Sequence, residues 1–102
     1  MNQRAPRKVV VQLYSRPGCH LCEQAQADLV RLARRYPHSL EVLDITASDD
    51  LLERYGQRIP VVRIGQQEYA APLEASQLER GLQAATTISL ASETPDGGVR
   101  AG

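Results

Sequence analysis

The sequence predicts an α/β fold in which a four-stranded mixed sheet carries helices on both faces. Three observations predict it. Short apolar runs alternate with stretches of helical periodicity. A connection long enough to hold a helix joins the first two strands, which implies a parallel pair. The two-residue link Gly65-Gln66 instead implies an antiparallel hairpin. The predicted order over residues 8–84 is β-α-β-α-β-β-α.

The first strand is expected over residues 8–14, because a β-branched run that is apolar on both faces is typical of a central strand. The first helix begins around Cys19 and ends near Arg35, since Pro37 disfavours the helical conformation in the residue before it. Its apolar face is formed by residues recurring every three or four positions: Leu21, Ala25, Leu29, Leu32 and Tyr36.

The second half of the chain holds a short helix, a hairpin and a final helix. The short helix has Ser48 as its N-cap and Gly56 as the C′ residue that ends it. The other elements are expected at residues 40–45 (second strand), 57–64 and 67–71 (hairpin strands) and 74–84 (last helix).

Composition and charge indicate a single soluble domain. The chain has 102 residues, of which 42% are hydrophobic and 24% are charged, and its formal net charge is +0. Nothing in this balance indicates binding to nucleic acid or to an anionic membrane. Residues 1–7 and 86–102 are polar and lack periodicity, so we expect both to be disordered tails.

The N-terminal sequence predicts a cytoplasmic protein. Residues 1–8 are polar, and the apolar run after them is too short for the core of a signal peptide. No stretch is long and apolar enough to span a membrane. Structural disulfides are rare in the cytoplasm, so a lone C-x-x-C pair there indicates redox chemistry or metal binding.

Such a pair, Cys19 and Cys22, follows the first strand directly. The N-terminus of a helix has unpaired N–H groups and a partial positive charge, which lower the pKa of a nearby thiol. The second thiol lies within reach of the first, so the pair can close to a disulfide and reopen. We therefore expect Cys19 to be the nucleophile and Cys22 the resolving thiol of a thiol–disulfide exchange site. A protonated His20 would stabilise the Cys19 thiolate further.

On these residues the sequence resembles the glutaredoxins, small proteins of the thioredoxin-like fold. The family has a strand ending in Tyr-Ser, then a basic residue, two more residues and C-x-x-C. Here these are Tyr14, Ser15, Arg16, Pro17-Gly18 and Cys19 to Cys22. Ile59-Pro60 stands where the family has a cis proline before its third strand. The resemblance extends over residues 8–84 and is greatest to small bacterial glutaredoxin-like proteins.

The resemblance implies a monomeric thiol–disulfide oxidoreductase that reduces protein or glutathione mixed disulfides. It implies no bound cofactor, with glutathione as a possible electron donor. Arg16 would hold a substrate carboxylate, such as that of glutathione. Pro60 would lie beside the cysteines, and the N–H and C=O groups of Ile59 would pair with an extended substrate.

Two segments depart from the glutaredoxin pattern. His20-Leu21 replaces the usual Pro-Tyr between the cysteines. Ala70-Ala71-Pro72 replaces the Gly-Gly and acidic residue that help the family hold the γ-glutamyl group of glutathione, and Glu74 is the next acidic residue. The sequence therefore does not predict how that group would be bound.

Structural zinc needs four converging ligands, and Cys19, Cys22, His20 and His38 are poorly spaced for it, so we expect no metal site within one chain.

Two other functions remain open at this point. An iron–sulfur cluster bridged between two chains by Cys19 is one alternative. A non-catalytic interaction domain that keeps the fold is the other.

Overall fold

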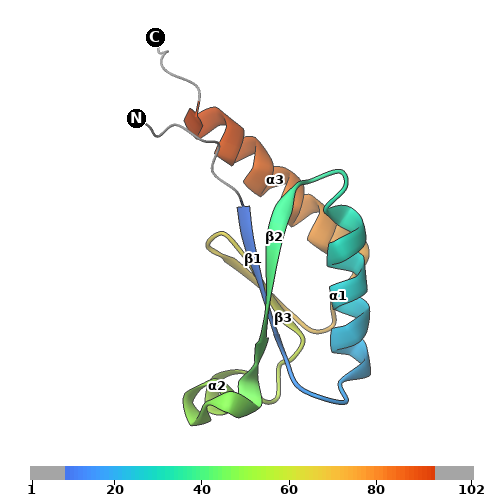
Figure 1. The fold of residues 1–102 in the computed structure, drawn as a ribbon, viewed down its shortest axis with the longest axis vertical. Helices are drawn as coiled ribbons and strands as arrows, with labels where there is room; N and C mark the ends of the chain where they lie inside the picture. Colours follow the sequence, from blue (N-terminus) through green and yellow to red (C-terminus); the bar gives the residue numbers. More distant parts are fainter. Residues whose placement is uncertain (1–8, 94–102) are drawn as a thin grey trace.

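The computed structural model describes residues 9–93, and the side chains of residues 9–86. Its elements, shown in Figure 1, are β1 (Val9–Ser15), α1 (His20–Leu32), β2 (His38–Asp44), a 3₁₀ turn η1 (Ile45–Ala47), α2 (Asp49–Tyr55), β3 (Val61–Ile64), β4 (Gln67–Ala70) and α3 (Ala75–Glu93). The predicted order of strands and helices is confirmed.

The four strands form one mixed sheet in the order β2-β1-β3-β4. β1 pairs in parallel with β2 and antiparallel with β3, and β3 pairs antiparallel with β4. Val11 lies opposite Leu40 of β2 on one side and Ile64 of β3 on the other. The apolar run at the start of the chain thus forms an interior strand, as its sequence predicts.

The larger hydrophobic cluster, which we call the main core, lies between the sheet and the helices α1 and α3, which lie on the same side of the sheet in Figure 1. The buried residues of the main core are Val11, Leu13, Ala25, Leu29, Leu32, Val62, Ile64, Leu78 and Leu82. Successive residues of a strand point to opposite faces, so alternate positions of β1 and β3 contribute to this core.

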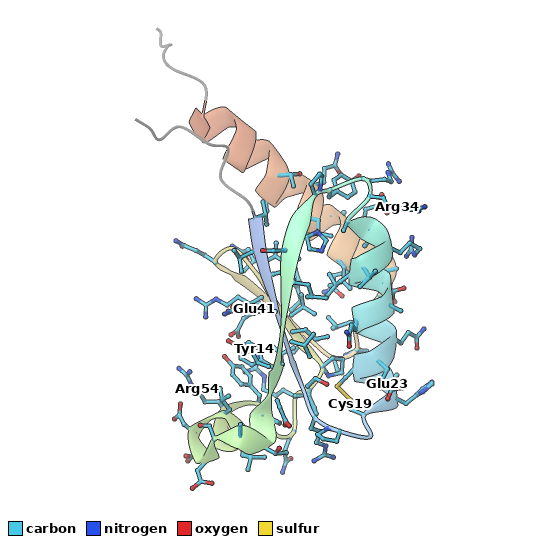
Figure 2. All side chains as sticks on the ribbon, in the orientation of Figure 1. Tyr14, Cys19, Glu23, Arg34, Glu41 and Arg54 are labelled. Atoms are coloured by element: carbon cyan, nitrogen blue, oxygen red, sulfur yellow. A yellow bond between two sulfur atoms is a disulfide. The ribbon has the colours of Figure 1, made fainter. Side chains whose placement is uncertain are left out.

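The opposite face of the sheet holds a smaller cluster, the second core, made of Tyr14, Ile45, Tyr55 and Val61. Figure 2 shows Tyr14 on the side of the sheet away from α1, close to α2. The rings of Tyr14 and Tyr55 are stacked with centroids 4.2 Å apart. The Tyr55 hydroxyl donates a hydrogen bond to Glu68 at 2.9 Å.

The second face is only partly covered, which refines the prediction of helices on both faces. α2 lies at one end of the sheet (Figure 1). Val10, at the other end of the same face, is 48% exposed. Beside it the Gln12 amide donates a hydrogen bond to Glu41 at 3.0 Å, so this part of the face is polar.

Two boundaries differ from the sequence prediction around the end of α2. Gly56 has φ −53°, a right-handed helical value, and is not the left-handed C′ residue that we expected. The chain instead leaves the helix by a turn in which the N–H groups of Arg58 and Ile59 both donate to the Tyr55 carbonyl. β3 consequently begins at Val61, four residues later than predicted.

The last helix is longer than predicted. α3 continues to Glu93, so residues 86–93, which we expected to belong to a disordered tail, are helical. The Thr86 hydroxyl donates to the carbonyls of Leu82 and Gln83, which satisfies its side chain within the helix. No proline or glycine falls between Gly81 and Pro95 to end the helix earlier. The predictions for residues 1–7 and 94–102 lie outside the described residues.

Candidate active site

A tight turn delivers Cys19 to the start of α1. The Cys19 N–H donates to the Arg16 carbonyl at 3.3 Å. Gly18, the third residue of this turn, has φ +79°, a conformation that costs glycine little. Proline second and a positive-φ glycine third define a type II turn. The Pro17-Gly18 sequence therefore favours the turn that precedes the cysteine pair, and the sequence alone predicts this turn.

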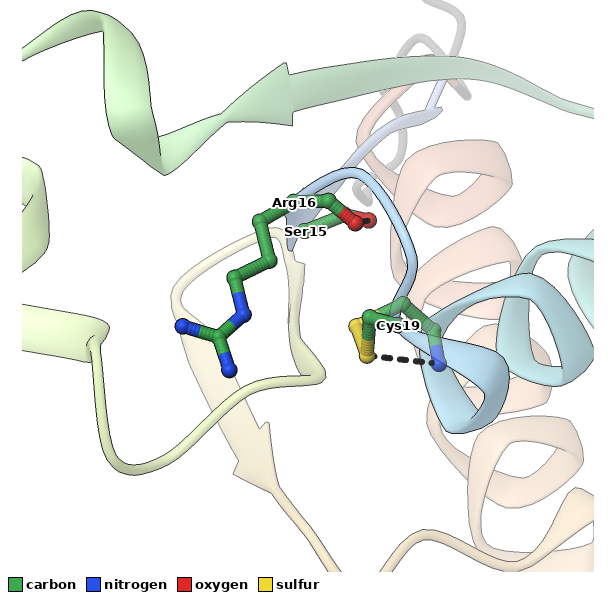
Figure 3. The surroundings of a disulfide bond; sticks show 4 residues. Ser15, Arg16 and Cys19 are labelled. Atoms are coloured by element: carbon green, nitrogen blue, oxygen red, sulfur yellow. Dashed lines mark hydrogen bonds between the residues drawn. A yellow bond between two sulfur atoms is a disulfide. The ribbon is translucent and has the colours of Figure 1, made fainter.

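Cys19 is the N-cap of α1, as the sequence predicts. Its Sγ atom accepts a hydrogen bond from the Cys22 backbone N–H at 3.1 Å. Figure 3 draws this bond beside the disulfide that joins the two cysteines. One of the unpaired N–H groups at the helix start is thus aimed at the sulfur, and the helix dipole adds partial positive charge. Both favour a thiolate when the disulfide is reduced.

The two sulfurs differ in their access to solvent. Cys22 is 1% exposed, whereas Cys19 is half-buried. The helix places Cys22 one turn after Cys19, on the inward-facing side that continues into the buried Ala25. An external disulfide therefore meets Cys19 before Cys22, which suits the roles predicted for the two thiols.

The Ile59-Pro60 peptide bond is cis, as the resemblance implies. Pro60 is buried and lines the same groove as Leu21, the residue just before Cys22. The Ile59 N–H, however, donates to the Tyr55 carbonyl at 3.1 Å and so is not free for a substrate strand. Within the described residues, the Ile59 carbonyl accepts no backbone hydrogen bond from a turn or loop.

Arg16 and His20 lie on the surface around the pair. Both are exposed, and neither lines the groove that holds Pro60. Figure 3 shows the Arg16 side chain extending to the side of the disulfide opposite α1. Within residues 9–86, no carboxylate lies within ion-pair distance of either side chain. Their predicted roles in binding substrate and stabilising the thiolate remain predictions.

A groove of about 390 Å³ lies next to the cysteine pair. Its walls are α1 on one side and the link from β4 into α3 on the other. The lining residues are Leu21, Gln24, Ala25, Asp28, Pro60, Ala71, Pro72, Leu73, Glu74, Ala75 and Leu78. The Ala71-Pro72 peptide bond in this wall is also cis, a feature that the sequence analysis did not predict.

The groove occupies the region in which the glutaredoxin pattern has Gly-Gly and an acidic residue. Here Ala71 and Pro72 form an apolar wall, and the Ala71 N–H donates to the carbonyls of Pro60 and Arg58. Within the described residues, no three His, Cys, Asp or Glu side chains are grouped so as to hold a metal ion.

Comparison with known families identifies the family to which the chain belongs. Residues 10–83 match the family model described as glutaredoxin-like domain (DUF836). The match covers every element from β1 to the first half of α3. The chain belongs to this glutaredoxin-like family. The resemblance stated from the sequence is thus confirmed.

Solved structures similar to this glutaredoxin-like protein agree with the assignment. The protein XcR50 from X. campestris is 33% identical, with a TM-score of 0.61, covering 72% of this chain and 96% of that one. The protein Ne2328 from Nitrosomonas europaea is 29% identical, with a TM-score of 0.63, covering 78% of this chain and 96% of that one. Mitochondrial thioredoxin 3 from Saccharomyces cerevisiae is 20% identical, with a TM-score of 0.59, over 76% of this chain and 78% of that one, a likeness of fold alone.

No protein with a curated description matches the chain. The described helices include none with the length and apolar character needed to cross a membrane. Family and fold together support a redox-type role for the Cys19–Cys22 pair.

Proposed function

We propose that this glutaredoxin-like protein is a thiol–disulfide oxidoreductase that reduces protein or glutathione mixed disulfides. One observation carries the proposal: the Cys19 sulfur caps α1 and accepts the Cys22 N–H, while Cys22 waits buried one turn behind it. This arrangement combines an accessible, stabilised thiolate with a resolving thiol that reaches only Cys19.

The reduced protein acts in two displacement steps. The Cys19 thiolate attacks one sulfur of the substrate disulfide, the substrate S–S bond breaks, and the departing thiolate takes a proton from solvent. Cys22, deprotonated, then attacks the Cys19 sulfur and releases the second substrate thiol. Two electrons have passed to the substrate, and the protein is left with the Cys19–Cys22 disulfide present in the structure.

A low-molecular-weight thiol such as glutathione restores the dithiol. The first glutathione thiolate forms a mixed disulfide with Cys19 and frees Cys22. The second attacks that mixed disulfide and leaves as oxidised glutathione, so the protein needs no bound cofactor. We infer that the protein works as a monomer in the cytoplasm, where such thiols are abundant.

Equilibration in glutathione redox buffers, read by intact mass after acid quenching, tests the proposal. Mass separates the dithiol, the internal disulfide and the protein carrying one glutathione. We expect a dithiol-to-disulfide transition between about −180 and −270 mV, the range of working oxidoreductases. A pair that stays fully oxidised or fully reduced across this range would contradict the proposal.

Trapping tests the two cysteine roles separately. Cys22→Ser should accumulate a mixed disulfide with substrate on Cys19, because the resolving thiol is gone. Cys19→Ser is the matched control and should accumulate far less, since the remaining thiol is buried. Equal trapping by both variants would reverse or remove the assignment of nucleophile and resolving thiol.

A further inference from the structure

We propose that the groove beside the cysteine pair binds an extended, positively charged peptide segment of a protein substrate. The inference rests on the proposed function and deepens it, because it assigns the class of substrate that this site reduces. It follows from the place, the dimensions and the charge of the groove.

The groove begins at Leu21, the residue that precedes Cys22, and runs along α1. Leu21 lies between the cysteines, and Gln24, Ala25 and Asp28 follow it on the same helix face at spacings of three, one and three residues. At 1.5 Å per residue, Leu21 to Asp28 spans about 10 Å. An extended peptide rises about 3.3 Å per residue, so about three residues cover this distance.

The surface next to the cysteines is apolar. Leu21 is 58% exposed although it is large and hydrophobic, and Pro72 on the facing wall is also exposed. These side chains offer contact to the backbone and small side chains that flank a substrate cysteine. The buried Pro60 closes the groove between them.

The charge of the groove is negative. Its ionisable lining residues are Asp28 from α1 and Glu74 from the opposite wall, and its lining includes no Lys, Arg or His. Within the described residues, Glu74 makes no ion pair. Asp28 lies 3.5 Å from Arg31, whose side chain is 61% exposed, so this pair is weak and a substrate cation can replace it.

These features favour a cationic peptide over glutathione as the occupant of the groove. A Lys or Arg about three residues from the substrate cysteine reaches Asp28 while its cysteine lies at Cys19, with Glu74 on the facing wall. Glutathione carries two carboxylates and one ammonium group, so its net negative charge makes it a poorer fit to the same groove. Each exposed charge pair changes a rate by about 1.5- to fivefold, so two carboxylates produce a measurable preference.

A series of symmetrical peptide disulfides tests the preference. The peptide is Lys-Ala-Ala-Cys-Ala-Ala-Lys with blocked ends, together with versions in which Gln or Glu replaces both lysines. Cations on both sides of the cysteine make the test independent of the direction in which the peptide lies. The rate of reduction by the reduced full-length protein is divided by the rate with dithiothreitol, which removes the effect of peptide charge on the disulfide itself.

We expect the Lys peptide to react about tenfold faster than the Glu peptide after this correction, and 0.5 M salt to reduce the ratio strongly. Asp28→Asn and Glu74→Gln should each lower the ratio about threefold, and the double variant should bring it close to one. Glu53→Gln, which removes the same charge from the exposed surface of α2, should leave it unchanged.

A corrected ratio near one in the wild-type protein, or one that survives in the double variant, would overturn the groove assignment while leaving the oxidoreductase intact. Failure to reduce any of the three peptides would overturn the proposed function, and the groove assignment with it. Oxidised glutathione as a fourth substrate provides a further check, since the acidic groove should make it slower than the Lys peptide.

Discussion

The two faces of the sheet hold the two halves of the candidate active site in different ways. On one face, α1 and α3 pack against the sheet, and nine buried residues form the main core. Ala25, Leu29 and Leu32 of this core belong to α1, the helix that begins at the cysteines. On the other, α2 covers one end only, and four buried residues form the second core. Ile59 packs against this smaller cluster, next to the cis Pro60.

The difference indicates that the packing around the cysteines is more extensive than the packing around Pro60. The main core fixes α1, and with it the spacing of Cys19 and Cys22. The second core positions the segment around Pro60, which lines the groove. Cavities in the main core should therefore lower the free energy of unfolding more than comparable damage to the second core.

The largest effect is expected from Leu29→Ala in the main core. Leu29 is fully buried, so the change leaves a cavity and should lower the free energy of unfolding by about 3 kcal/mol. Val30→Ala is the control. The Val30 side chain is 59% exposed, so its truncation should change the free energy of unfolding by less than about 0.5 kcal/mol. Urea unfolding followed by circular dichroism measures both. Equal effects would mean that α1 is not anchored by the main core.

A smaller loss is expected from Gly81→Val, where α3 crosses the sheet closely. A Cβ at Gly81 would lie 2.8 Å from the Tyr69 hydroxyl oxygen and 3.1 Å from Ile64 Cδ1. Overpacking should lower the free energy of unfolding by about 2 kcal/mol, more than the better helix propensity of valine recovers. The Tyr69→Phe background removes the nearest atom and should recover part of the loss. Stabilisation by Gly81→Val would refute the close approach.

In the second core, Tyr55→Phe should lower the free energy of unfolding by about 1 kcal/mol, because Glu68 loses a 2.9 Å hydrogen bond. Tyr36→Phe makes the same chemical change beside the main core, where the Tyr36 hydroxyl is 3.3 Å from Glu79, and should cost less. Chemical denaturation of both variants compares the two faces directly. A larger loss for Tyr36→Phe would mean that the 3.3 Å hydrogen bond to Glu79 contributes more to stability than the 2.9 Å hydrogen bond to Glu68.

A further expected effect is a dependence of stability on alkaline pH that arises from Tyr55 in the second core. Burial, and then the hydrogen bond to Glu68, raise the pKa of Tyr55 to about 12 from its usual value of 10.0. The folded protein therefore holds this proton more tightly than the unfolded chain. The resulting stability is fully present below pH 10 and is lost as the pH rises from 10 to 12. Urea midpoints across this interval should fall less steeply for Tyr55→Phe than for the wild type, and parallel curves would exclude the linkage.

The sequence predicts those parts of the fold and the site that depend on local signals. Strand and helix order follow from periodicity, and the N-cap position of Cys19 follows from its place between a strand and an amphipathic helix. The cis Pro60 follows from the resemblance, since the sequence alone favours a trans bond.

The parts that were not predicted depend on tertiary contacts. The sequence of residues 57–60 predicts a strand. In the structure these residues form a turn, because the Tyr55 carbonyl accepts hydrogen bonds from Arg58 and Ile59 and Ile59 packs against the second core. Asp28 reads as a surface residue of α1, and only the folded link before α3 places Glu74 across a groove from it. Val10 is exposed because α2 does not extend over its end of the sheet. The sequence of α2 does not predict where on the sheet the helix lies.

The capping bond at Cys19 links the redox state of the protein to the integrity of a helix. In the oxidised form the Cys22 N–H donates to a neutral disulfide sulfur. After reduction the same N–H meets a thiolate, and hydrogen bonds to charged acceptors are stronger. The first turn of α1 should then open less often, so that exchange of the Cys22 amide proton with solvent slows. The amide signal of Cys22 alone should therefore distinguish the reduced form of the protein from the oxidised form.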